Sequence, residues 1–390
     1  MYVIIKGNKQ KRLVESMKIL HTGDLHLDSP FSTLQAERGE QAKRELRTVF
    51  SDIIAYVKNN SVDLLLISGD LFDSGFATRE TAALLADGFE KAGCPVVIAP
   101  GNHDPFDENS IWKKRTFSDN VHIFASEQLS YFDFEELGAR VYGYAFTSQY
   151  MKGCPIETGS CEGDKINILC AHGDTASPLS QYCPIAPAAI SDFGADYTAL
   201  GHIHSPEAAN DVLWQKELSA AYCGCPQGRD FGECGVKGAW LVEIEKNGGK
   251  AEVNRQFVPF SLSIYEDREL KVDGAETAAD IISELRTYID SEDFGENTHL
   301  RITLCGYTAP GLVAPCDEIE EQCKEGLLSL TVVDETVPQM SSDELECDRG
   351  IRGEVYRMLI ETIENGTHEE RKNAIAALRY ALAALSGESI

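Results

Sequence analysis

The sequence predicts an α/β fold with a largely parallel sheet, followed by smaller modules. Short apolar runs alternate with longer helical patterns over residues 18–99, and this alternation is typical of parallel strands joined by helices. Because helices then cover the sheet, we expect its strands to be buried on both faces. A chain of 390 residues also exceeds what one hydrophobic core usually organises, so we expect one or two smaller domains as well.

The main domain begins with the series strand, helix, strand, helix, strand. More strands follow, and after residue 204 they become hairpin-like, with Asn247-Gly248-Gly249 as a turn that tolerates positive φ. In such a sheet, ligands bind beyond the carboxyl ends of the strands. The expected strands are 18–22, 63–67, 95–99, 121–124, 140–144, 165–171, 197–200, 239–245 and 251–258, and the expected helices are 40–59 and 78–92.

Two further modules are expected after the main domain. A helix at 277–290 and a strand at 300–305 predict a small α/β module, and a helix pair broken at Gly366 ends the chain. The second helix of the pair carries an apolar stripe on one face, formed by Ile375, Leu378, Leu382 and Leu385. The expected segments are a leader or alternative start at 1–16, the main domain at 17–260, the α/β module at 261–345 and the helical segment at 346–390.

Composition places the chain among ordinary globular proteins. Hydrophobic residues make up 43% and charged residues 25% of it, which excludes the compositions of disordered and fibrous chains. No run approaches the roughly 20 apolar residues of a membrane span, and no signal peptide is recognisable. The twelve cysteines form no CxxC pair, so we expect reduced thiols, a cytoplasmic location and no membrane partner.

The net charge of −28 bears on the substrate. A polyanionic surface repels nucleic acid and weakens the part of binding that phosphate contacts supply. Divalent cations bound in an acidic cleft would reverse the local field. The charge therefore counts against a nucleic-acid substrate without excluding one.

Five short polar motifs follow predicted strands. They contain five of the nine histidines, together with carboxylates and an asparagine, and no thiolate. Carboxylate, imidazole and amide oxygen are ligands that suit manganese, iron or zinc. Because parallel strands place their ends at one edge of a sheet, the motifs predict one metal site. They are Asp24-Leu-His26, Gly69-Asp70-Leu-Phe-Asp73, Gly101-Asn102-His103-Asp104, Ala171-His172-Gly173 and Gly201-His202-Ile-His204.

The order and content of these motifs resemble the calcineurin-like metallophosphoesterase superfamily over roughly residues 17–260. Two segments, 21–31 and 225–231, look like the SbcD/YhaO type of DNA repair exonuclease. The resemblance implies a sandwich of β-sheets flanked by helices. It also implies that the α/β module is a capping domain and that the terminal helix pair docks a partner. Packing against its own domain explains the apolar stripe of the pair equally well.

The resemblance assigns seven ligands to two divalent ions, with manganese expected and iron or zinc as alternatives. Two such ions share a carboxylate, lower the pKa of a bound water and bind the phosphate oxygens. Asp70 would be the shared ligand. One ion is assigned Asp24, His26, Asp70 and His204, and the other is assigned Asp70, Asn102, His172 and His202.

His103 matches the family histidine that is not a ligand and that protonates the leaving oxygen. Such an imidazole needs a carboxylate to fix its tautomer and raise its basicity, and Asp73 is the expected partner. Asp104 is a second candidate for that role. The alternative for Asp104 is a turn residue that accepts hydrogen bonds from nearby backbone amides.

Two basic segments are candidates for substrate contacts. Lys113, Lys114 and Arg115 lie shortly after the third motif and could meet a nucleic-acid backbone, although a solvated charged face is the favoured explanation. Arg229 lies in the family-like segment after the last motif. It could contact the substrate or pair with an acidic neighbour such as Glu233.

The resemblance implies a manganese-dependent DNA exonuclease or endonuclease that acts with an SbcC- or YhaN-like ATPase, and it allows a homodimer. The main alternative is a phosphoesterase for nucleotides or another small phosphodiester, because the motifs specify phosphate chemistry and not the leaving group. The negative charge favours this alternative. A binding module with a decayed site is a third class, which the complete set of expected ligands opposes.

Overall fold

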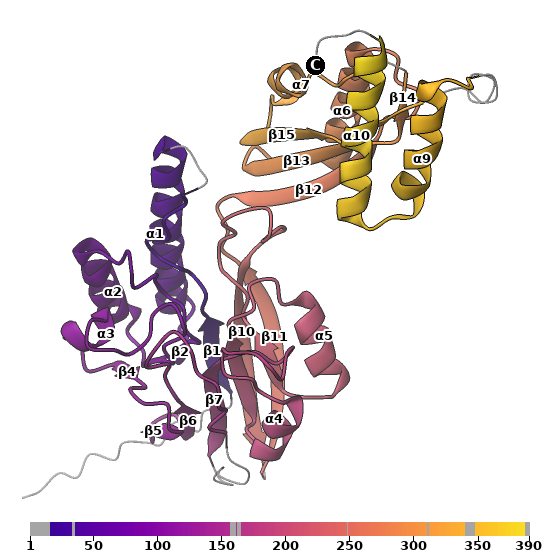
Figure 1. Ribbon diagram of the computed structural model, residues 1–390. Helices are drawn as coiled ribbons and strands as arrows, with labels where there is room; N and C mark the ends of the chain where they lie inside the picture. The colour runs from indigo at the N-terminus through magenta and orange to yellow at the C-terminus, as the bar shows by residue number, and fades with distance from the viewer. Residues whose placement is uncertain are drawn as a thin grey trace, which may run out of the picture. The chain divides into compact units, whose positions relative to one another are not determined.

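The structure is a computed structural model of the 390-residue chain, and it divides into two compact units (Figure 1). Unit 1 comprises residues 1–229 and 236–262, and unit 2 comprises 230–235 and 263–390. The expected leader at 1–16 lies outside the described residues except for its last residue, and so does Gly248 of the hairpin turn. The structure describes residues 16–32, 36–156, 161, 165–247, 249–309, 312–339 and 348–386.

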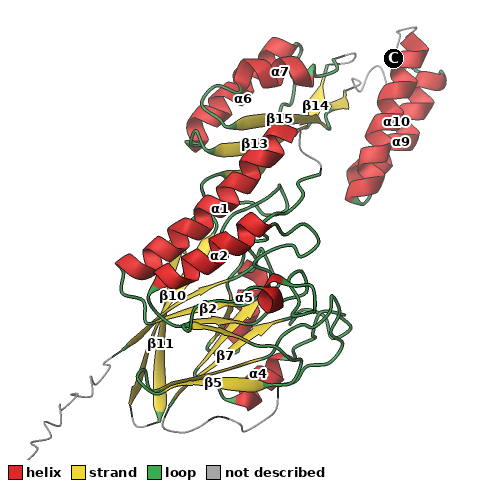
Figure 2. Cartoon of the chain, turned by 90° about the vertical axis from the view of Figure 1, so that its left-hand side faces the viewer, coloured by secondary structure: helices red, strands yellow, loops and turns green. Residues whose placement is uncertain are grey.

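The first sheet of unit 1 has the strand order β11-β10-β1-β2-β3-β4. Strands β1 to β4 are parallel, and β10 and β11 form an antiparallel hairpin that pairs with β1. Helices α1 and α2 lie side by side along one face (Figure 2). The bounds are β1 Met17–Thr22, α1 Ala36–Asn59, β2 Leu64–Ile67, α2 Arg79–Ala92, β3 Val96–Ile98, α3 Ile111–Lys114, β4 Val121–Ile123, β10 Gly238–Asn247 and β11 Lys250–Pro259.

A second sheet in unit 1 has the order β5-β6-β7-β8-β9. Strands β6 to β9 are parallel, and β5 is antiparallel to β6. The sequence had indicated the three central strands but not β5, β9 or the two helices beside them. The bounds are β5 Ser130–Phe134, β6 Ala139–Gly143, β7 Ile166–His172, α4 Pro187–Phe193, β8 Tyr197–Gly201, α5 Glu207–Gln215 and β9 Ala220–Tyr222.

Unit 1 has three hydrophobic cores, one between the two sheets and one on the outer face of each sheet. Leu20 and Leu65 face the helices of the first sheet, whereas Ile19 and Leu66 face the second sheet and meet Ile168 there. On the far side, the second sheet packs against α4 and α5. Because successive side chains of a strand point to opposite faces, each apolar run serves two cores at once. The expected burial of both faces is confirmed, and the layers are helices, sheet, sheet and helices.

Unit 2 contains a parallel three-stranded sheet with the order β12-β13-β15, packed on α6 and α7. Helix α6 begins with a capping box, in which Thr277 and Asp280 exchange side-chain and backbone hydrogen bonds. Helices α9 and α10 form a hairpin whose buried side packs against β16. The bounds are β12 Ile264–Lys271, α6 Ala278–Glu292, β13 Thr298–Cys305, β14 Tyr307–Thr308, α7 Cys316–Cys323, β15 Ser329–Asp334, β16 Val337–Pro338, α9 Ile351–Asn365 and α10 His368–Ser386.

The mixed α/β class predicted from the sequence is confirmed, with several sheets flanked by helices. Within the described residues, none of the helices combines the length and apolar character needed to cross a bilayer.

Candidate metal centre

The five motifs lie at the ends of five strands that belong to both sheets of unit 1. Strands β1, β2 and β3 of the first sheet precede the first three motifs, whereas β7 and β8 of the second sheet precede the last two. Sequence alone had suggested a single sheet edge. The structure instead brings the edges of two facing sheets together, so that ligands reach the site from two sides.

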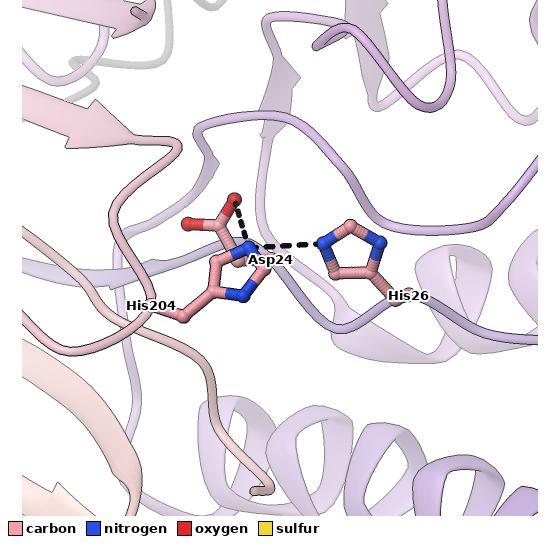
Figure 3. A group of neighbouring side chains, drawn as sticks. All are labelled: Asp24, His26 and His204. Atoms are coloured by element: carbon pink, nitrogen blue, oxygen red, sulfur yellow. Dashed lines mark hydrogen bonds and ion pairs between the residues drawn. The ribbon is translucent and has the colours of Figure 1, made fainter. Parts of the chain in front are cut away.

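The first ligand group consists of Asp24, His26 and His204, whose ligand atoms all lie within 4.8 Å of one another (Figure 3). The Nε2 atoms of His26 and His204 are 3.1 Å apart, and His204 Nε2 is 3.9 Å from Asp24 Oδ1. Asp24 and His26 are fully buried. Three such donors facing one point are an arrangement that a divalent cation would stabilise.

The second ligand group consists of Asp70, His172 and His202. His172 Nε2 lies 3.3 Å from Asp70 Oδ2 and 2.9 Å from Asn102 Oδ1, so the amide oxygen of Asn102 joins this group. The structure thus brings together all seven residues that the sequence proposed as ligands.

Asp70 lies between the two groups. Its Oδ2 atom is 3.9 Å from His26 Nε2 in the first group and 3.3 Å from His172 Nε2 in the second. Its Oδ1 atom accepts a hydrogen bond from the backbone N–H of His103, at 2.8 Å. One oxygen is therefore held by the backbone while the other faces both groups, which is the position of a bridging carboxylate.

The donor set fits two hard or borderline divalent ions. Asp24 and Asp70 place two carboxylates in a fully buried site, and buried carboxylates need a compensating positive charge. The thiol of Cys223 contacts this site and donates to Asp24 Oδ2 at 3.6 Å. Burial and the Asp24 carboxylate raise the pKa of Cys223 well above its usual value, so this residue is a neutral thiol and not a thiolate ligand.

The backbone of the site adopts left-handed conformations at residues other than glycine. Asp24 and His26 have φ of 49° and Asp70 has φ of 50°, at a cost of roughly 1–3 kcal/mol each. Hydrogen bonds from Asp24 N to Gly69 O and from His26 N to Asp70 O hold these loops against each other. Gly69 itself has φ of 94°, and a Cβ there would lie 2.5 Å from His172 Nδ1.

Hydrogen bonds at Nδ1 orient two of the histidines. His26 Nδ1 lies 2.7 Å from Asp73 Oδ1, and His172 Nδ1 lies 2.8 Å from the carbonyl oxygen of Ser68. An acceptor at Nδ1 fixes the proton there and leaves Nε2 as the metal-binding atom. In both residues Nε2 is the atom that faces the other ligands.

The environment also sets the charge of these ligands. Burial lowers the pKa of His26, and burial together with the charge of His172 lowers the pKa of His202 to about 4. Both imidazoles are thus neutral at pH 7 and able to bind a cation. Burial lowers the pKa of His172 as well, but the adjacent Asp70 carboxylate outweighs it and raises the value to about 9.

His103 lies beside the ligand groups and is 47% exposed at its side chain. Its Nδ1 is 3.1 Å from Asp73 Oδ1, and this hydrogen bond raises the pKa of His103. Asp73 therefore contacts both the proposed acid and the ligand His26. The sequence had paired Asp73 with His103 only, because spacing along the chain gives no sign of its second partner, 47 residues away.

The contacts of Asp104 match one of the two roles that the sequence left open. Its carboxylate accepts hydrogen bonds from the backbone N–H groups of Asp70, Leu71 and Gly101, at 3.0, 2.9 and 2.7 Å. Burial and the nearby Asp70 charge raise the pKa of Asp104 to about 8. These contacts match the alternative in which Asp104 accepts hydrogen bonds from nearby backbone amides. Asp104 thereby connects the second motif to the third.

A cleft of about 710 Å³ opens beside His103, and we call it the metal-site cleft. Arg229 lines it and lies 3.0 Å, through Nη2, from His204 Nδ1. The sequence had given no sign of Phe76, which lines the cleft with its side chain 58% exposed, three residues after Asp73. The other lining residues are Ser29, Pro30, Asp73, Ser74, Gly75, Asn102, Pro105, Asp107, Thr147, Ser148 and Gln149.

The basic segment after the third motif lies on the short helix α3 and just beyond it. Lys113 forms an ion pair with Glu108, and the Lys114 ammonium donates to Asn109 Oδ1 at 3.0 Å. Neither lysine nor Arg115 is among the residues that line the metal-site cleft.

Comparisons with known proteins relate the chain to metallophosphoesterases. Residues 17–206 match the family model of calcineurin-like phosphoesterases. The chain is 28% identical over 255 residues to YhaO of Bacillus subtilis, an uncharacterised metallophosphoesterase, covering 62% of this chain and 61% of that protein. It is 25% identical over 276 residues to the SbcD component of the SbcCD nuclease of Staphylococcus epidermidis, covering 62% of this chain and 69% of that protein.

Among solved structures, TT1561 of Thermus thermophilus aligns with 61% of this chain and 98% of its own, at a TM-score of 0.34 and 11% identity. The match to YhaO spans less than two thirds of the length of that relative. Residues 17–206 of the chain are a domain of the calcineurin-like metallophosphoesterase family. Within that family, it is similar to the SbcD/YhaO type.

Proposed function

We propose that the chain is a two-metal phosphodiesterase that cleaves DNA as an exonuclease or endonuclease in DNA repair. Membership of the metallophosphoesterases implies metal-dependent hydrolysis of a phosphoester. The observation that carries the proposal is the pair of buried ligand groups that share Asp70 Oδ2, at 3.9 and 3.3 Å from their nearest histidine nitrogens. Manganese is the proposed metal, with iron or zinc as alternatives.

Each residue has a defined part in the proposed reaction. Two bound divalent ions would supply a water of lowered pKa and neutralise charge on the phosphate oxygens. His103 donates the proton that the leaving oxygen needs, and Asp73 holds its ring in place through Nδ1. Arg229 lines the cleft and donates to a phosphate oxygen. A metal bound at His204 Nε2 would keep the proton on Nδ1, so Arg229 could then donate to the phosphate in place of His204.

DNA is proposed as the substrate for two reasons. One relative of the chain is a component of a nuclease. In addition, the metal-site cleft combines an exposed phenyl ring at Phe76 with polar side chains, and exposed aromatic rings stack on unpaired bases. The alternative is a small phosphodiester, which the net charge of −28 favours.

A single assay separates the two substrates. Hydrolysis of linear duplex DNA, single-stranded DNA and bis(p-nitrophenyl) phosphate is compared with Mn²⁺ present, and again after chelation. We expect all activity to need the metal and DNA to be cleaved. Cleavage of the small ester alone would contradict the DNA proposal.

The control for this assay is Asp70→Asn, which keeps the volume of the side chain. Because Asp70 faces both ligand groups, we expect this variant to lose nearly all activity on every substrate. Wild-type turnover with two metal ions retained would remove Asp70 from the bridge.

A further inference from the structure

A second pocket of unit 1, distinct from the metal-site cleft, has the size of a small-molecule site. Its volume is about 320 Å³, at the lower end of the range of ligand pockets, about 300–1,000 Å³. It lies among α5, the loop at residues 223–225 and strands β10 and β11, and it shares no lining residue with the cleft. His204 also lines it, so the pocket adjoins a ligand of the metal centre. We call it the aromatic pocket.

Three aromatic rings form one part of its lining. The ring centres of Trp214 and Trp240 are 6.0 Å apart, and those of Trp240 and Phe257 are 5.6 Å apart. Both indole N–H groups donate to backbone carbonyls, Trp214 to Ala220 at 3.2 Å and Trp240 to Tyr222 at 3.0 Å. The rings are therefore held in place with their polar atoms already satisfied, and they offer a ligand apolar ring surface.

A buried cation lines the same pocket. Lys237 is only 5% exposed, and its ammonium is 3.4 Å from Ser205 Oγ. Throughout the described part of the chain, this long contact is its one side-chain hydrogen bond, and no carboxylate lies within ion-pair distance. A buried ammonium with so little compensation is costly. Its remaining N–H groups would be satisfied by acceptor atoms on a ligand.

Acidic residues on α5 limit which ligands fit. Glu207 and Asp211 are exposed and also line the pocket. Two carboxylates repel a phosphate group but accept hydrogen bonds from ring N–H and amino groups. A ligand must therefore combine a flat ring, acceptor atoms on one edge and donor groups on another.

We propose that the aromatic pocket binds a nucleobase. The base would stack on the ring of Phe257, which is 39% exposed, as bases do on aromatic side chains in single-strand binding proteins. Because the Trp240 ring lies at 71° to that of Phe257, the base would contact Trp240 edge to face. Lys237 would donate to ring acceptors such as O6 and N7 of guanine, and a carboxylate of α5 would accept from its N–H groups. The proposal goes beyond the phosphodiesterase reaction, because a nucleoside without phosphate can occupy this pocket.

Fluorescence tests the proposal directly, because the chain has three tryptophans and two of them line the pocket. Trp112→Phe removes the third, which packs on Phe72 in a different core. In this full-length background, guanosine is titrated with chelator present, and ribose 5-phosphate serves as the ligand that lacks a base. We expect saturable quenching by guanosine and none by ribose 5-phosphate.

Two variants locate the binding. Phe257→Leu removes a stacking ring, and we expect guanosine binding to weaken by about 5- to 150-fold, the range that the loss of one base–aromatic stack produces. Lys237→Met keeps the apolar stem but not the ammonium, and should weaken binding at least about tenfold. Lys91→Met, on the exposed side of α2, is the matched control and should bind like the parent.

Circular dichroism and thermal melting establish that each variant is folded. Should Lys237→Met not fold, Phe257→Leu still decides the question, because Phe257 is 39% exposed on β11. Absence of saturable quenching, or unchanged affinity in the folded variants, would overturn the base pocket. Neither result depends on hydrolysis, so a failure here is distinguishable from failure of the proposed nuclease activity.

Discussion

At the scale of single residues, one carboxylate contacts both a proposed metal ligand and the proposed acid. Asp73 Oδ1 lies 2.7 Å from Nδ1 of the ligand His26 and 3.1 Å from Nδ1 of the proposed acid His103. A group that orients both rings keeps the acid at a fixed distance from the metal ligands. This arrangement suits a reaction in which the leaving oxygen must receive its proton beside the metal centre.

Replacing His103 tests the separation between acid and ligands. His103→Ala should retain two metal ions, because its imidazole is not among the seven proposed ligands, and should lose about 10²- to 10⁴-fold in turnover on substrates with a poor leaving group. Metal content is measured in the folded variant beside kcat for DNA. Loss of one or both ions would show that His103 is itself a ligand.

Replacing Phe76 tests the cleft as a nucleic-acid site. Hydrogen bonds from Phe76 N to Asp73 O and from Ser74 N to His103 O fix this loop against the proposed acid. Phe76→Ala should therefore weaken DNA cleavage by about 5- to 150-fold, from a stacking loss of about 1–3 kcal/mol. Hydrolysis of bis(p-nitrophenyl) phosphate should stay unchanged, and Phe76→Trp should restore DNA cleavage. An equal loss on both substrates would point to a structural role.

At the scale of elements, the hairpin of α9 and α10 buries most of its apolar stripe within unit 2. Ile375 and Leu378 are buried against Tyr356 and Ile363 of α9, and Leu382 packs beside them, whereas Leu385 is 46% exposed. Packing within the hairpin thus accounts for most of the stripe. Other exposed apolar residues of the hairpin are Ile351 and Met358 of α9, which are 70% and 74% exposed, and Tyr380 of α10, which is 59% exposed.

Arg379 of α10 connects this hairpin to the end of strand β15 by hydrogen bonds. Its guanidinium donates to the Asp334 carboxylate and to both the carbonyl and the hydroxyl oxygen of Thr336. Arg379→Met should lower the free energy of unfolding of unit 2 by about 1.5–3 kcal/mol, the contribution of hydrogen bonds to a charged group. It should also speed hydrogen exchange in α9 and α10.

The matched control is Arg371→Met on the same helix, whose exposed side chain forms no hydrogen bond or ion pair among the described residues. Urea unfolding and hydrogen exchange are measured for both variants. Equal effects of the two substitutions would mean that the contacts of Arg379 contribute nothing specific.

At the scale of the whole molecule, charge opposes the proposed substrate. With a net charge of −28, the chain alone should bind DNA weakly, because few of its cations can replace the counterions of the phosphates. An SbcC- or YhaN-like ATPase is the proposed source of the missing affinity. Ile351, Val355 and Met358 have the i, i+4, i+7 spacing of a helix that docks in an apolar groove, and we propose this face of α9 as its contact.

Salt titration tests whether the ATPase supplies most of the affinity for DNA. The logarithm of DNA affinity should fall shallowly with salt for the chain alone and steeply with the ATPase present, at about −0.9 per contacted phosphate. The double substitution Ile351→Ser and Met358→Ser should abolish the steepening. Leu179→Ser, at a site 89% exposed in unit 1, is the control. Tight, steeply salt-dependent binding by the chain alone would contradict the prediction.

The sequence by itself determined the residue types of the proposed ligands and their order. Asp24, Asp70 and His172 could be recognised because each motif follows a short apolar strand, and strand ends are where parallel sheets present polar residues. The strands could be predicted because short continuous runs of apolar residues are typical of buried strands. The segments that sequence reasoning missed are amphipathic or short, such as β12, whose residues Glu266 to Glu269 are all charged.

Only the tertiary structure decided how these pieces meet. Two sheets, and not one, bring their strand ends together, and this places Asp70 Oδ2 between ligand groups whose members are up to 180 residues apart, as Asp24 and His204 are. Asp73 contacts His26, and Lys237 is buried beside three aromatic rings. These contacts cannot be predicted from the sequence pattern around each residue. They depend on how the faces of sheets and helices pack against each other, which neighbouring residues in the chain do not determine.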